Sequence, residues 1–294
     1  MKYVPVLLLI FFVLLTGNSF AKEKTYTAFQ VAVTGHGQPV ILIPGATCSG
    51  DEWKETIAHY GGKYEFHVIT IAGYAGTQPL PGGPYLETVK NQLEQYITDK
   101  KLNNVILVGH SIGGFLSIWI ASEMKHGLSK VVVVDAMPFL AGANNPNAAD
   151  TFSESQAKLM LERYNKMNDS ALAANQKMMA KFMCMDSTRW ELIVNWGVKS
   201  DKKTMAYTMT EMMSKDLRKK IADIKIPVLV LAAFAKVPQY PQFTRESVIA
   251  LYESQYKACT TCMVHAAEDN TKHFIMYDNP AWLYKEMDSF LAAK

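Results

Sequence analysis

From Phe29 onward, short apolar runs alternate with stretches in which apolar residues recur every three to four positions. The short β-branched runs predict strands, and the 3.6-residue periodicity predicts amphipathic helices. The expected strands are Phe29–Val33, Val40–Ile43, His67–Ile71, Val105–Val108 and Val131–Val134, and the expected helices are Glu52–Tyr60, Leu86–Lys100 and Phe115–Met124. This alternation predicts an α/β fold with a mostly parallel central sheet flanked by helices on both faces.

The alternation stops after Pro138, and no strand-like run returns before about residue 220. Helical segments fill this stretch, at Ser153–Met167, Ala171–Met183, Thr188–Trp196 and Lys202–Lys219. We expect these segments to form an inserted helical lid over about residues 139–220. The alternation then resumes with a strand at Ile226–Ala233, a helix at Thr244–Tyr256, a strand at Thr261–Ala266 and a final helix at Pro280–Ala293.

Residues 1–21 have the pattern of a secretory signal peptide and not that of a folded segment. Lys2 precedes an apolar run from Val4 to Leu15, and Ser19-Phe20-Ala21 places small residues where a signal peptidase cleaves. The apolar run is also short for a bilayer span. We therefore expect cleavage after Ala21, export to the periplasm or the medium without stable membrane insertion, and one folded domain over residues 22–294.

Composition and charge narrow the class of partner. Of the 294 residues, 49% are hydrophobic and 19% are charged, so the chain has enough apolar mass for a large core. The formal net charge is only +3, and the charged residues are scattered along the chain. This pattern predicts no nucleic-acid partner and leaves the oligomeric state open.

Four cysteines lie in the part of the chain that we expect to be exported, namely Cys48, Cys184, Cys259 and Cys262. An oxidising compartment permits disulfides, and four cysteines allow three pairings, among which the sequence does not choose. Cys259-Thr-Thr-Cys262 has the spacing of a redox or zinc half-site, but zinc needs two further ligands and a redox motif normally opens a helix beside a strand. We expect a structural disulfide or inert thiols, and no metal site.

The sequence most indicative of chemistry is the G-x-S-x-G motif at Gly109–Gly113. It follows the expected strand Val105–Val108 and leads directly into the expected helix Phe115–Met124. In this setting the serine lies on a sharp turn, with its hydroxyl exposed beside backbone N–H groups. The two glycines keep the turn sharp and let the helix approach the strand closely, where a Cβ would collide. Ser111 is therefore the candidate nucleophile.

Three segments, in order along the chain, resemble the α/β-hydrolase fold family over essentially the whole mature chain. They are Val40–Gly50 followed by Trp53, the Gly109–Gly113 turn, and Lys272–Pro280, where a His-Phe pair precedes a proline-led final helix. The resemblance implies that Ser111 attacks a carbonyl with His273 as its base. An aliphatic hydroxyl needs such a base, and a histidine, with an ordinary pKa near 6.5, can take the proton and later return it.

The resemblance also implies an oxyanion hole built from the backbone N–H groups of Ala46 and Ile112. The family usually has His-Gly where this chain has Pro44-Gly45, a change that leaves the backbone donor in place. The other six histidines have simpler interpretations, as a neighbour of the serine or as turn, surface or satisfied core positions: His36, His59, His67, His110, His126 and His265.

The acid that would orient His273 is not fixed by the sequence. Family members most often carry it in the loop after the next-to-last strand, but residues 232–240 contain neither Asp nor Glu. Asp135 ends the strand that follows the serine turn, a position that some members use, and it keeps the order Ser, Asp, His. We favour Asp135, with Asp269 and Glu268 as the alternatives, or no acid at all.

Two further features bear on the pocket. Ten of the sixteen methionines fall in the expected lid, either as an adaptable pocket wall or, in the interpretation that we favour, as core faces of packed helices. The glycine-rich loop Ile71–Pro79, which contains Tyr74, either lines the pocket mouth or forms a structural turn.

Together these observations predict an exported serine hydrolase of carboxylesterase type. It would cleave an ester, or an amide or lactone, of a small to medium apolar substrate through an acyl-enzyme, with no cofactor and no metal. Two alternatives stay open: a non-catalytic binding protein on a hydrolase fold, and a cofactor-free lyase that uses the same serine and histidine.

Overall fold

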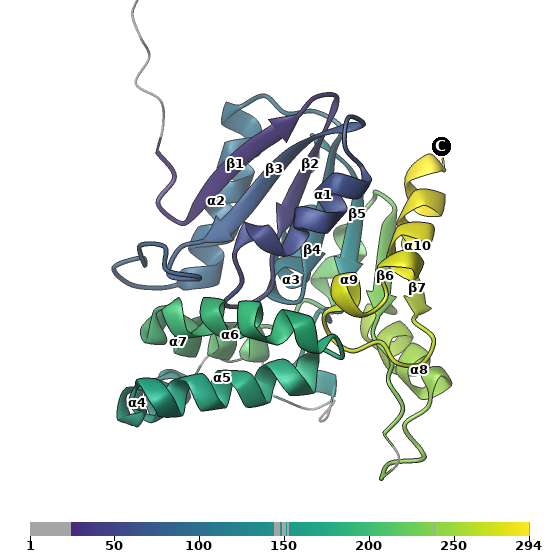
Figure 1. Ribbon diagram of the computed structural model, residues 1–294. Coiled ribbons are helices and arrows are strands. Elements are labelled where there is room, and N and C mark those ends of the chain that lie inside the picture. The colour runs from purple at the N-terminus through teal and green to yellow at the C-terminus, as the bar shows by residue number, and fades with distance from the viewer. Residues whose placement is uncertain (1–24, 144–147, 149–150, 152, 238, 294) are drawn as a thin grey trace, which may run out of the picture.

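A seven-stranded sheet forms the centre of the protein (Figure 1). The computed structural model describes residues 25–143, 148, 151, 153–237 and 239–293. The spatial order is β1-β3-β2-β4-β5-β6-β7; β1 runs antiparallel to β3, and every other neighbouring pair is parallel. The prediction of a mostly parallel sheet is confirmed. The strands are β1 (Phe29–Gly35), β2 (Gln38–Ile43), β3 (Tyr64–Ile71), β4 (Val105–His110), β5 (Leu128–Val134), β6 (Val228–Ala232) and β7 (Cys262–Ala266).

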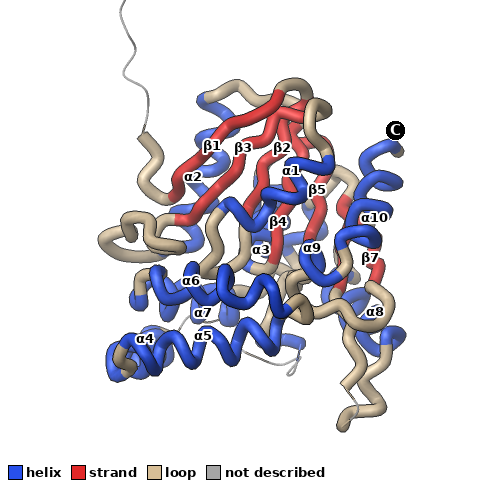
Figure 2. Tube along the Cα trace, in the orientation of Figure 1, coloured by secondary structure: helices blue, strands red, loops and turns tan. Residues whose placement is uncertain are grey.

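Helices cover both faces of this sheet (Figure 2). Leu107 and Val131 point to the face covered by α2, α3 and α8, whereas Val108 and Val132 point to the face covered by α1, α9 and α10. Because both faces are buried, the central strands are continuous apolar runs without polar alternation. These helices are α1 (Lys54–His59), α2 (Tyr85–Asp99), α3 (Ile112–Glu123), α8 (Arg245–Tyr256), α9 (Ile275–Asp278) and α10 (Pro280–Ala292).

Four helices are inserted between β5 and β6, and they lie across the carboxyl-terminal edge of the sheet (Figure 1). They are α4 (Glu154–Lys166), α5 (Asp169–Met183), α6 (Trp190–Lys199) and α7 (Lys202–Ser214).

Two of the helices predicted in this insertion begin or end at other residues than expected. The segment expected at Lys202–Lys219 ends at Ser214, and α6 begins only after a short 3₁₀ turn at Ser187–Arg189.

The inserted helices are bonded to the body of the protein. The Glu211 carboxylate of α7 accepts from the backbone N–H groups of Tyr85 and Leu86, at 2.8 and 2.7 Å, and so caps the first turn of α2. The Tyr74 hydroxyl lies 2.6 Å from the Thr208 hydroxyl of α7. These contacts place the insertion over the ends of the parallel strands, where ligands bind in open α/β sheets.

The cysteines confirm one expectation. Cys259 and Cys262 form a disulfide that joins the end of α8 to the start of β7, so this motif is a structural link. Cys48 and Cys184 are free thiols, and both are buried. In the described ranges, no group of three or more His, Cys, Asp or Glu side chains is placed to hold a metal ion.

The expected signal peptide, residues 1–21, lies outside the described residues. In the part of the chain that the structure does describe, none of the helices is both long and apolar enough to span a bilayer.

Candidate active site

Ser111 occupies a strained turn between β4 and α3. Its backbone has φ 52° and ψ −121°, a conformation that a non-glycine residue adopts only when its surroundings enforce it. The surroundings here are close backbone contacts. A Cβ on Gly109 would lie 2.2 Å from the Gly113 carbonyl oxygen, and a Cβ on Gly113 would lie 2.2 Å from that of Ile43. The two glycines therefore allow the close approach of helix to strand that the motif predicts.

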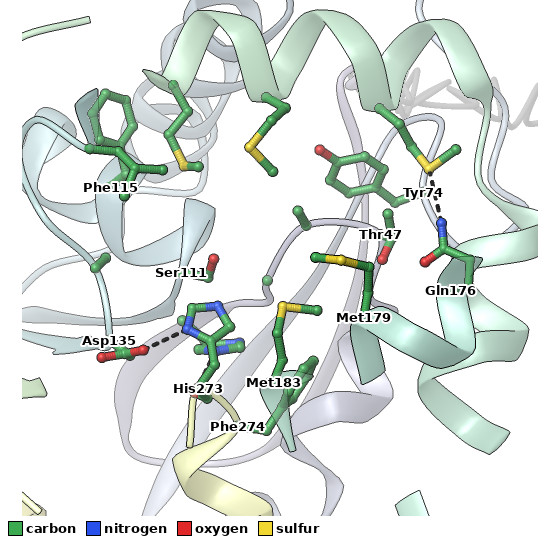
Figure 3. Close-up of a pocket in the computed structure, with 18 of the residues that line it drawn as sticks. Thr47, Tyr74, Ser111, Phe115, Asp135, Gln176, Met179, Met183, His273 and Phe274 are labelled. Atoms are coloured by element: carbon green, nitrogen blue, oxygen red, sulfur yellow. Dashed lines mark hydrogen bonds and ion pairs between the residues drawn. The ribbon is translucent and has the colours of Figure 1, made fainter. Parts of the chain in front are cut away.

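Ser111 opens into a cavity of about 700 Å³ between the sheet edge and the inserted helices (Figure 3). Asp135, His273 and Ala46 line the same cavity. The structure thus brings together residues that are far apart in the sequence. The Ser111 hydroxyl makes no hydrogen bond to any described residue, an arrangement common in ligand-free sites, where hydrogen bonds between reacting groups tighten on binding.

The His273 ring is held by Asp135. Its Nδ1 lies 2.6 Å from Asp135 Oδ2, while Asp135 Oδ1 accepts from the Ala233 N–H at 2.8 Å and from the Tyr252 hydroxyl at 2.7 Å. Burial favours the neutral acid, but the hydrogen bond and charge of His273, together with the other two donors, keep the pKa of Asp135 below its ordinary value. Asp135 is therefore an ionised acceptor that keeps a proton on Nδ1 and leaves Nε2 free to take one.

The other two candidate acids lie elsewhere. Asp269 accepts from the backbone N–H groups of Lys236 and Asn270, both at 2.8 Å, and pairs with the Lys236 ammonium at 3.1 Å. Glu268 is exposed to solvent. Of the three carboxylates considered from the sequence, the structure therefore places only Asp135 against the His273 ring.

The loop after β2 supplies the opposite wall of the site. Ala46 lines the cavity, and the next residue, Thr47, has φ 66°, a second strained position in the cavity lining. Ile112 is the first residue of α3, so its N–H is one of the helix's unpaired amino-terminal donors. The two amides implied for an oxyanion hole thus come from the two segments that border Ser111.

Sequence reasoning missed a buried pair beneath this site. Glu52 Oε1 lies 2.7 Å from His110 Nδ1, and Glu52 Oε2 accepts from the Gly45 N–H at 2.9 Å. His110 Nε2 in turn donates to the backbone carbonyl of His273 at 3.0 Å. The pair therefore connects the Gly45 loop to the His273 loop. The only signal in the sequence is a glutamate beside the apolar Trp53, because its partner lies 58 positions away.

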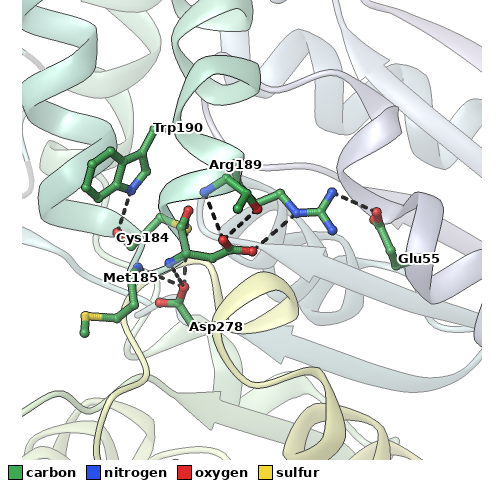
Figure 4. A network of polar contacts seen from close by, with 8 residues as sticks. Glu55, Cys184, Met185, Arg189, Trp190 and Asp278 are labelled. Atoms are coloured by element: carbon green, nitrogen blue, oxygen red, sulfur yellow. Dashed lines mark hydrogen bonds and ion pairs between the residues drawn. The ribbon is translucent and has the colours of Figure 1, made fainter.

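A second carboxylate, Asp278, bonds to the segment between α5 and α6, beside Met185 (Figure 4). Its Oδ2 accepts from the Lys272 N–H at 2.9 Å, and its Oδ1 accepts from the N–H groups of Met185 and Asp186 at 2.9 and 3.0 Å. Nearby, Arg189 Nη1 donates to Glu55 Oε1 at 2.9 Å, which joins the start of α6 to α1. The junction between α5 and α6 is therefore anchored at the site.

The other histidines are bonded away from the site or lie outside it. His67 is buried between the Tyr96 hydroxyl and the Glu65 carboxylate, at 2.7 and 3.0 Å, as a satisfied core residue. His265 pairs with Glu286 on the surface. His110 also lines the cavity, but both of its ring nitrogens are bonded, to Glu52 and to the His273 carbonyl, whereas His273 has a bond only at Nδ1 among the described residues.

The methionines of the inserted helices make much of the cavity wall. Seven of the ten methionines in the inserted segment line the cavity, so the interpretation that we favoured, in which they only form the core faces of packed helices, was wrong. Met205 and Met212 both line the cavity and pack in the core. Those seven are Met160, Met167, Met179, Met183, Met205, Met209 and Met212. Tyr74 also lines the cavity, but as a fully buried residue and not at the mouth.

Comparison with known proteins agrees with this geometry. A model of the alpha/beta hydrolase family matches residues 40–286. A pimeloyl-[acyl-carrier protein] methyl ester esterase of Vibrio cholerae is 24% identical over 209 residues, covering 68% of this chain and 76% of the relative. A non-heme chloroperoxidase of Kitasatospora aureofaciens is 27% identical over 143 residues, covering 47% of this chain and 52% of the relative.

Solved structures share the fold across nearly the whole chain. An esterase from Exiguobacterium antarcticum superposes with a TM-score of 0.74 at 15% identity, covering 91% of this chain and 98% of the other. An enol-lactonase from Burkholderia xenovorans gives 0.72 at 15% identity, covering 90% of this chain and 96% of the other. At this identity the likeness is one of fold, and the chemistry has to be argued from the residues.

Proposed function

The chain belongs to the alpha/beta hydrolase family, and from this premise we propose that it is a serine esterase of carboxylesterase type. Its substrate is an ester, or a lactone or amide, with a small to medium apolar part. The observation that carries the proposal is the 2.6 Å contact between His273 Nδ1 and Asp135 Oδ2 in the cavity that holds Ser111. The relatives that are named as esterases and the enol-lactonase fold neighbour support the same reaction class.

The proposed chemistry begins with proton transfer. His273 Nε2 takes the proton of Ser111 as its Oγ attacks the carbonyl carbon, and the tetrahedral oxyanion is held by the N–H groups of Ala46 and Ile112. His273 then gives the proton to the departing alkoxide, and an acyl-enzyme remains. In the second half of the reaction, His273 takes a proton from water as the water oxygen attacks the acyl carbon. His273 then returns that proton to Ser111 Oγ as the bond between Oγ and the acyl carbon breaks and the acid leaves. Asp135 stabilises the imidazolium of His273 at each stage without taking its proton.

The cavity supports an apolar substrate. Its volume of about 700 Å³ falls in the range of small-molecule sites, and methionine side chains, which repack easily, form much of its wall. Burying apolar carbon there stabilises the complex by roughly 25 cal/mol per Å² of surface removed from water. The inserted helices α4 to α7 act as the lid in this proposal, because α4, α5 and α7 supply that wall and α6 packs against α5.

A fluorophosphonate probe tests the nucleophile, since it phosphonylates only a serine that is activated by its base. We expect stoichiometric labelling of the wild-type chain at Ser111, together with hydrolysis of 4-nitrophenyl esters. Ser111→Ala should abolish both, whereas Ser254→Ala, at an exposed serine of α8, should retain both. If the folded wild-type chain is not labelled, the chain is a binding protein on a hydrolase fold. Labelling with cleavage of cyanohydrins but not of esters would instead indicate a lyase.

We also propose that the enzyme works outside the cytoplasm, with residues 1–21 removed as a signal peptide. The disulfide between Cys259 and Cys262 supports this, because structural disulfides persist in oxidising compartments. The amino-terminal sequence of the protein recovered from the periplasm or medium tests it, and we expect that sequence to begin at Lys22. Recovery of an uncleaved chain from the cytoplasm would contradict it.

A further inference from the structure

The cavity has a polar end on the side away from Ser111. Figure 3 shows Gln176 and Thr47 at this end, with Met179 and Met183 between them and the catalytic side chains. Gln176 lies on α5 and is only 9% exposed, so its carboxamide is withdrawn from bulk water. The far wall of a mostly apolar cavity thus carries a buried amide.

The carboxamide of Gln176 lacks an oxygen or nitrogen partner among the residues that the structure describes. Within the described ranges its side chain has one hydrogen-bond partner, the Met205 thioether sulfur, 4.0 Å from Nε2, and a thioether is a weak acceptor. The neighbouring helix leaves room for the group, because a Cβ on Gly197 of α6 would lie 2.4 Å from Gln176 Oε1. A buried amide without a partner is unfavourable unless something else satisfies it.

The Thr47 side-chain hydroxyl is a second polar group at the same end of the cavity. Its carbonyl accepts from the Ser200 hydroxyl of α6 at 3.3 Å, but its own hydroxyl has no hydrogen bond within the described ranges. The charged residues that line the cavity lie apart from this end or at the surface: Asp135 is bonded to His273, and Arg163 of α4 is exposed. The two side chains named at this end, Gln176 and Thr47, are themselves neutral and together offer both donors and acceptors.

We propose that the substrate carries a neutral hydrogen-bonding group, such as a hydroxyl, keto or amide group, remote from the carbonyl that Ser111 attacks, and that Gln176 selects it. This inference rests on the proposed function and makes its substrate class more specific: an apolar spacer with a polar terminus. A site built to hydrogen-bond such a group discriminates against the analogue that lacks it, because the analogue leaves the buried amide unpaired.

Matched pairs of methyl esters test the inference, each a plain acyl ester and its ω-hydroxy counterpart, with acyl chains of about four to eight carbons. For the chain length that reaches Gln176, we expect kcat/KM to favour the hydroxy ester by about tenfold or more. Gln176→Met, which keeps length but removes the amide, should abolish most of that preference by lowering kcat/KM for the hydroxy ester toward the value that the same variant shows for the plain ester. Thr47→Val should reduce the preference in part.

Lys177→Met is the matched control, since Lys177 is exposed on the same helix, and it should keep the wild-type preference. The rate of labelling by a small fluorophosphonate shows that each variant is folded with an intact site. Hydrolysis without any preference, or a preference that survives in Gln176→Met, would overturn the inference.

Binding to the Ser111→Ala protein separates this inference from the proposed function. Calorimetry should give about tenfold tighter binding of the favoured hydroxy ester than of its plain partner, and the added Gln176→Met change should remove the difference. If this holds while the wild-type chain hydrolyses no ester, the polar end is supported and the esterase proposal fails. Equal binding of the two esters would contradict the proposed recognition by Gln176 and would leave the esterase proposal untouched.

Discussion

Glu52 and His110 form a buried pair directly beneath the site, with Glu52 Oε1 2.7 Å from His110 Nδ1 and both side chains at most 1% exposed. The carbonyl of His273 can only accept, so His110 Nε2 must carry a hydrogen. Burial alone would lower the pKa of His110, but the Glu52 carboxylate raises it above its ordinary value. Because Nε2 carries a hydrogen, the contact between His110 Nδ1 and Glu52 Oε1 must hold a second proton between the two atoms, and the pair holds both the Gly45 N–H and the His273 loop.

Removing the Glu52 carboxylate should destabilise the protein strongly. In Glu52→Ala, both His110 Nδ1 and the Gly45 N–H lose their partner in the interior, and we expect the free energy of unfolding to fall by about 3–5 kcal/mol. In Glu52→Gln the amide can still donate to a neutral His110 and accept from Gly45, so the loss should be about 1 kcal/mol. Urea unfolding measures both. Equal losses in the two variants would contradict the pairing.

Asp135→Asn should nearly abolish turnover while leaving the fold intact. The asparagine oxygen can keep the bonds from Ala233 and Tyr252, which turns its NH₂ group toward His273 Nδ1. Nδ1 must then accept, the ring proton moves to Nε2, and His273 can no longer take the Ser111 proton. We expect kcat to fall by roughly 10³ to 10⁴.

Tyr252→Phe is the control for this change. It removes one of the three donors to Asp135 but leaves the contact with His273, so we expect less than about a tenfold loss in kcat. Steady-state hydrolysis of a 4-nitrophenyl ester compares the variants. Comparable losses in both would mean that Asp135 acts through Tyr252 and not through the imidazole.

Asp135 should also make stability depend on pH in the acid range. Its pKa is lower in the folded protein than in the unfolded chain, because His273 and the other donors outweigh the effect of burial. Its ionised form therefore stabilises the fold above the unfolded pKa of about 3.9, and this contribution is lost as the pH falls through the folded pKa. The difference in unfolding free energy between wild type and Asp135→Asn should shrink below about pH 4. A constant difference down to pH 2 would contradict this.

Those parts of the site that depend on local sequence were predictable. The buried run of β4, the two glycines and the apolar α3 together define the turn that carries Ser111, and the His-Phe pair before a proline-led helix locates His273. In contrast, the choice of Asp135 over Asp269 depends on which strands are neighbours. Asp135 follows β5, which pairs with β6, and it therefore receives the N–H of Ala233 just after that strand.

The pair formed by Glu52 and His110 was not predictable for the same reason. Apart from the neighbouring Trp53, nothing within one turn of Glu52 indicates that it is buried. Its partners are Gly45, in the loop after β2, and His110 of β4, which in turn bonds to the His273 carbonyl. The pocket-lining role of the methionines was missed because helical spacing gives the face that is buried but not what it is buried against. Met205 shows this, as it packs in the core and also lines the cavity.

Alanine at Gly109 should disrupt the turn. Its Cβ would lie 2.2 Å from the Gly113 carbonyl oxygen and 2.5 Å from the Ser117 hydroxyl, so α3 would have to move away from β4. We expect a loss of more than about 3 kcal/mol in unfolding free energy, or failure to fold. Gly82→Ala is the matched control, since a Cβ at Gly82 would have open space within 4 Å, and it should change stability by no more than about 1 kcal/mol. Thermal unfolding of both variants distinguishes a local steric effect from a general cost of replacing glycine.

Asp278 offers a test of whether the inserted helices position His273. Its Oδ1 holds the N–H groups of Met185 and Asp186, and its Oδ2 holds the N–H of Lys272, the residue before His273. In Asp278→Asn the oxygen should turn toward the two donors of the insertion, which leaves Lys272 unpaired. In Asp278→Ala all three backbone donors, together with the Cys184 thiol that donates to Oδ1 at 3.3 Å, lose their acceptor.

We therefore expect both Asp278 variants to lose about tenfold in kcat, because small displacements of a reacting group reduce rate steeply. Only Asp278→Ala should also lose about 2–3 kcal/mol of stability, since hydrogen bonds to a charged acceptor are individually strong. Ester hydrolysis and urea unfolding measured on the same preparations separate the two effects. Wild-type kcat in Asp278→Asn would show that the His273 loop keeps its position without the carboxylate, and the insertion would then cover the site without positioning the histidine.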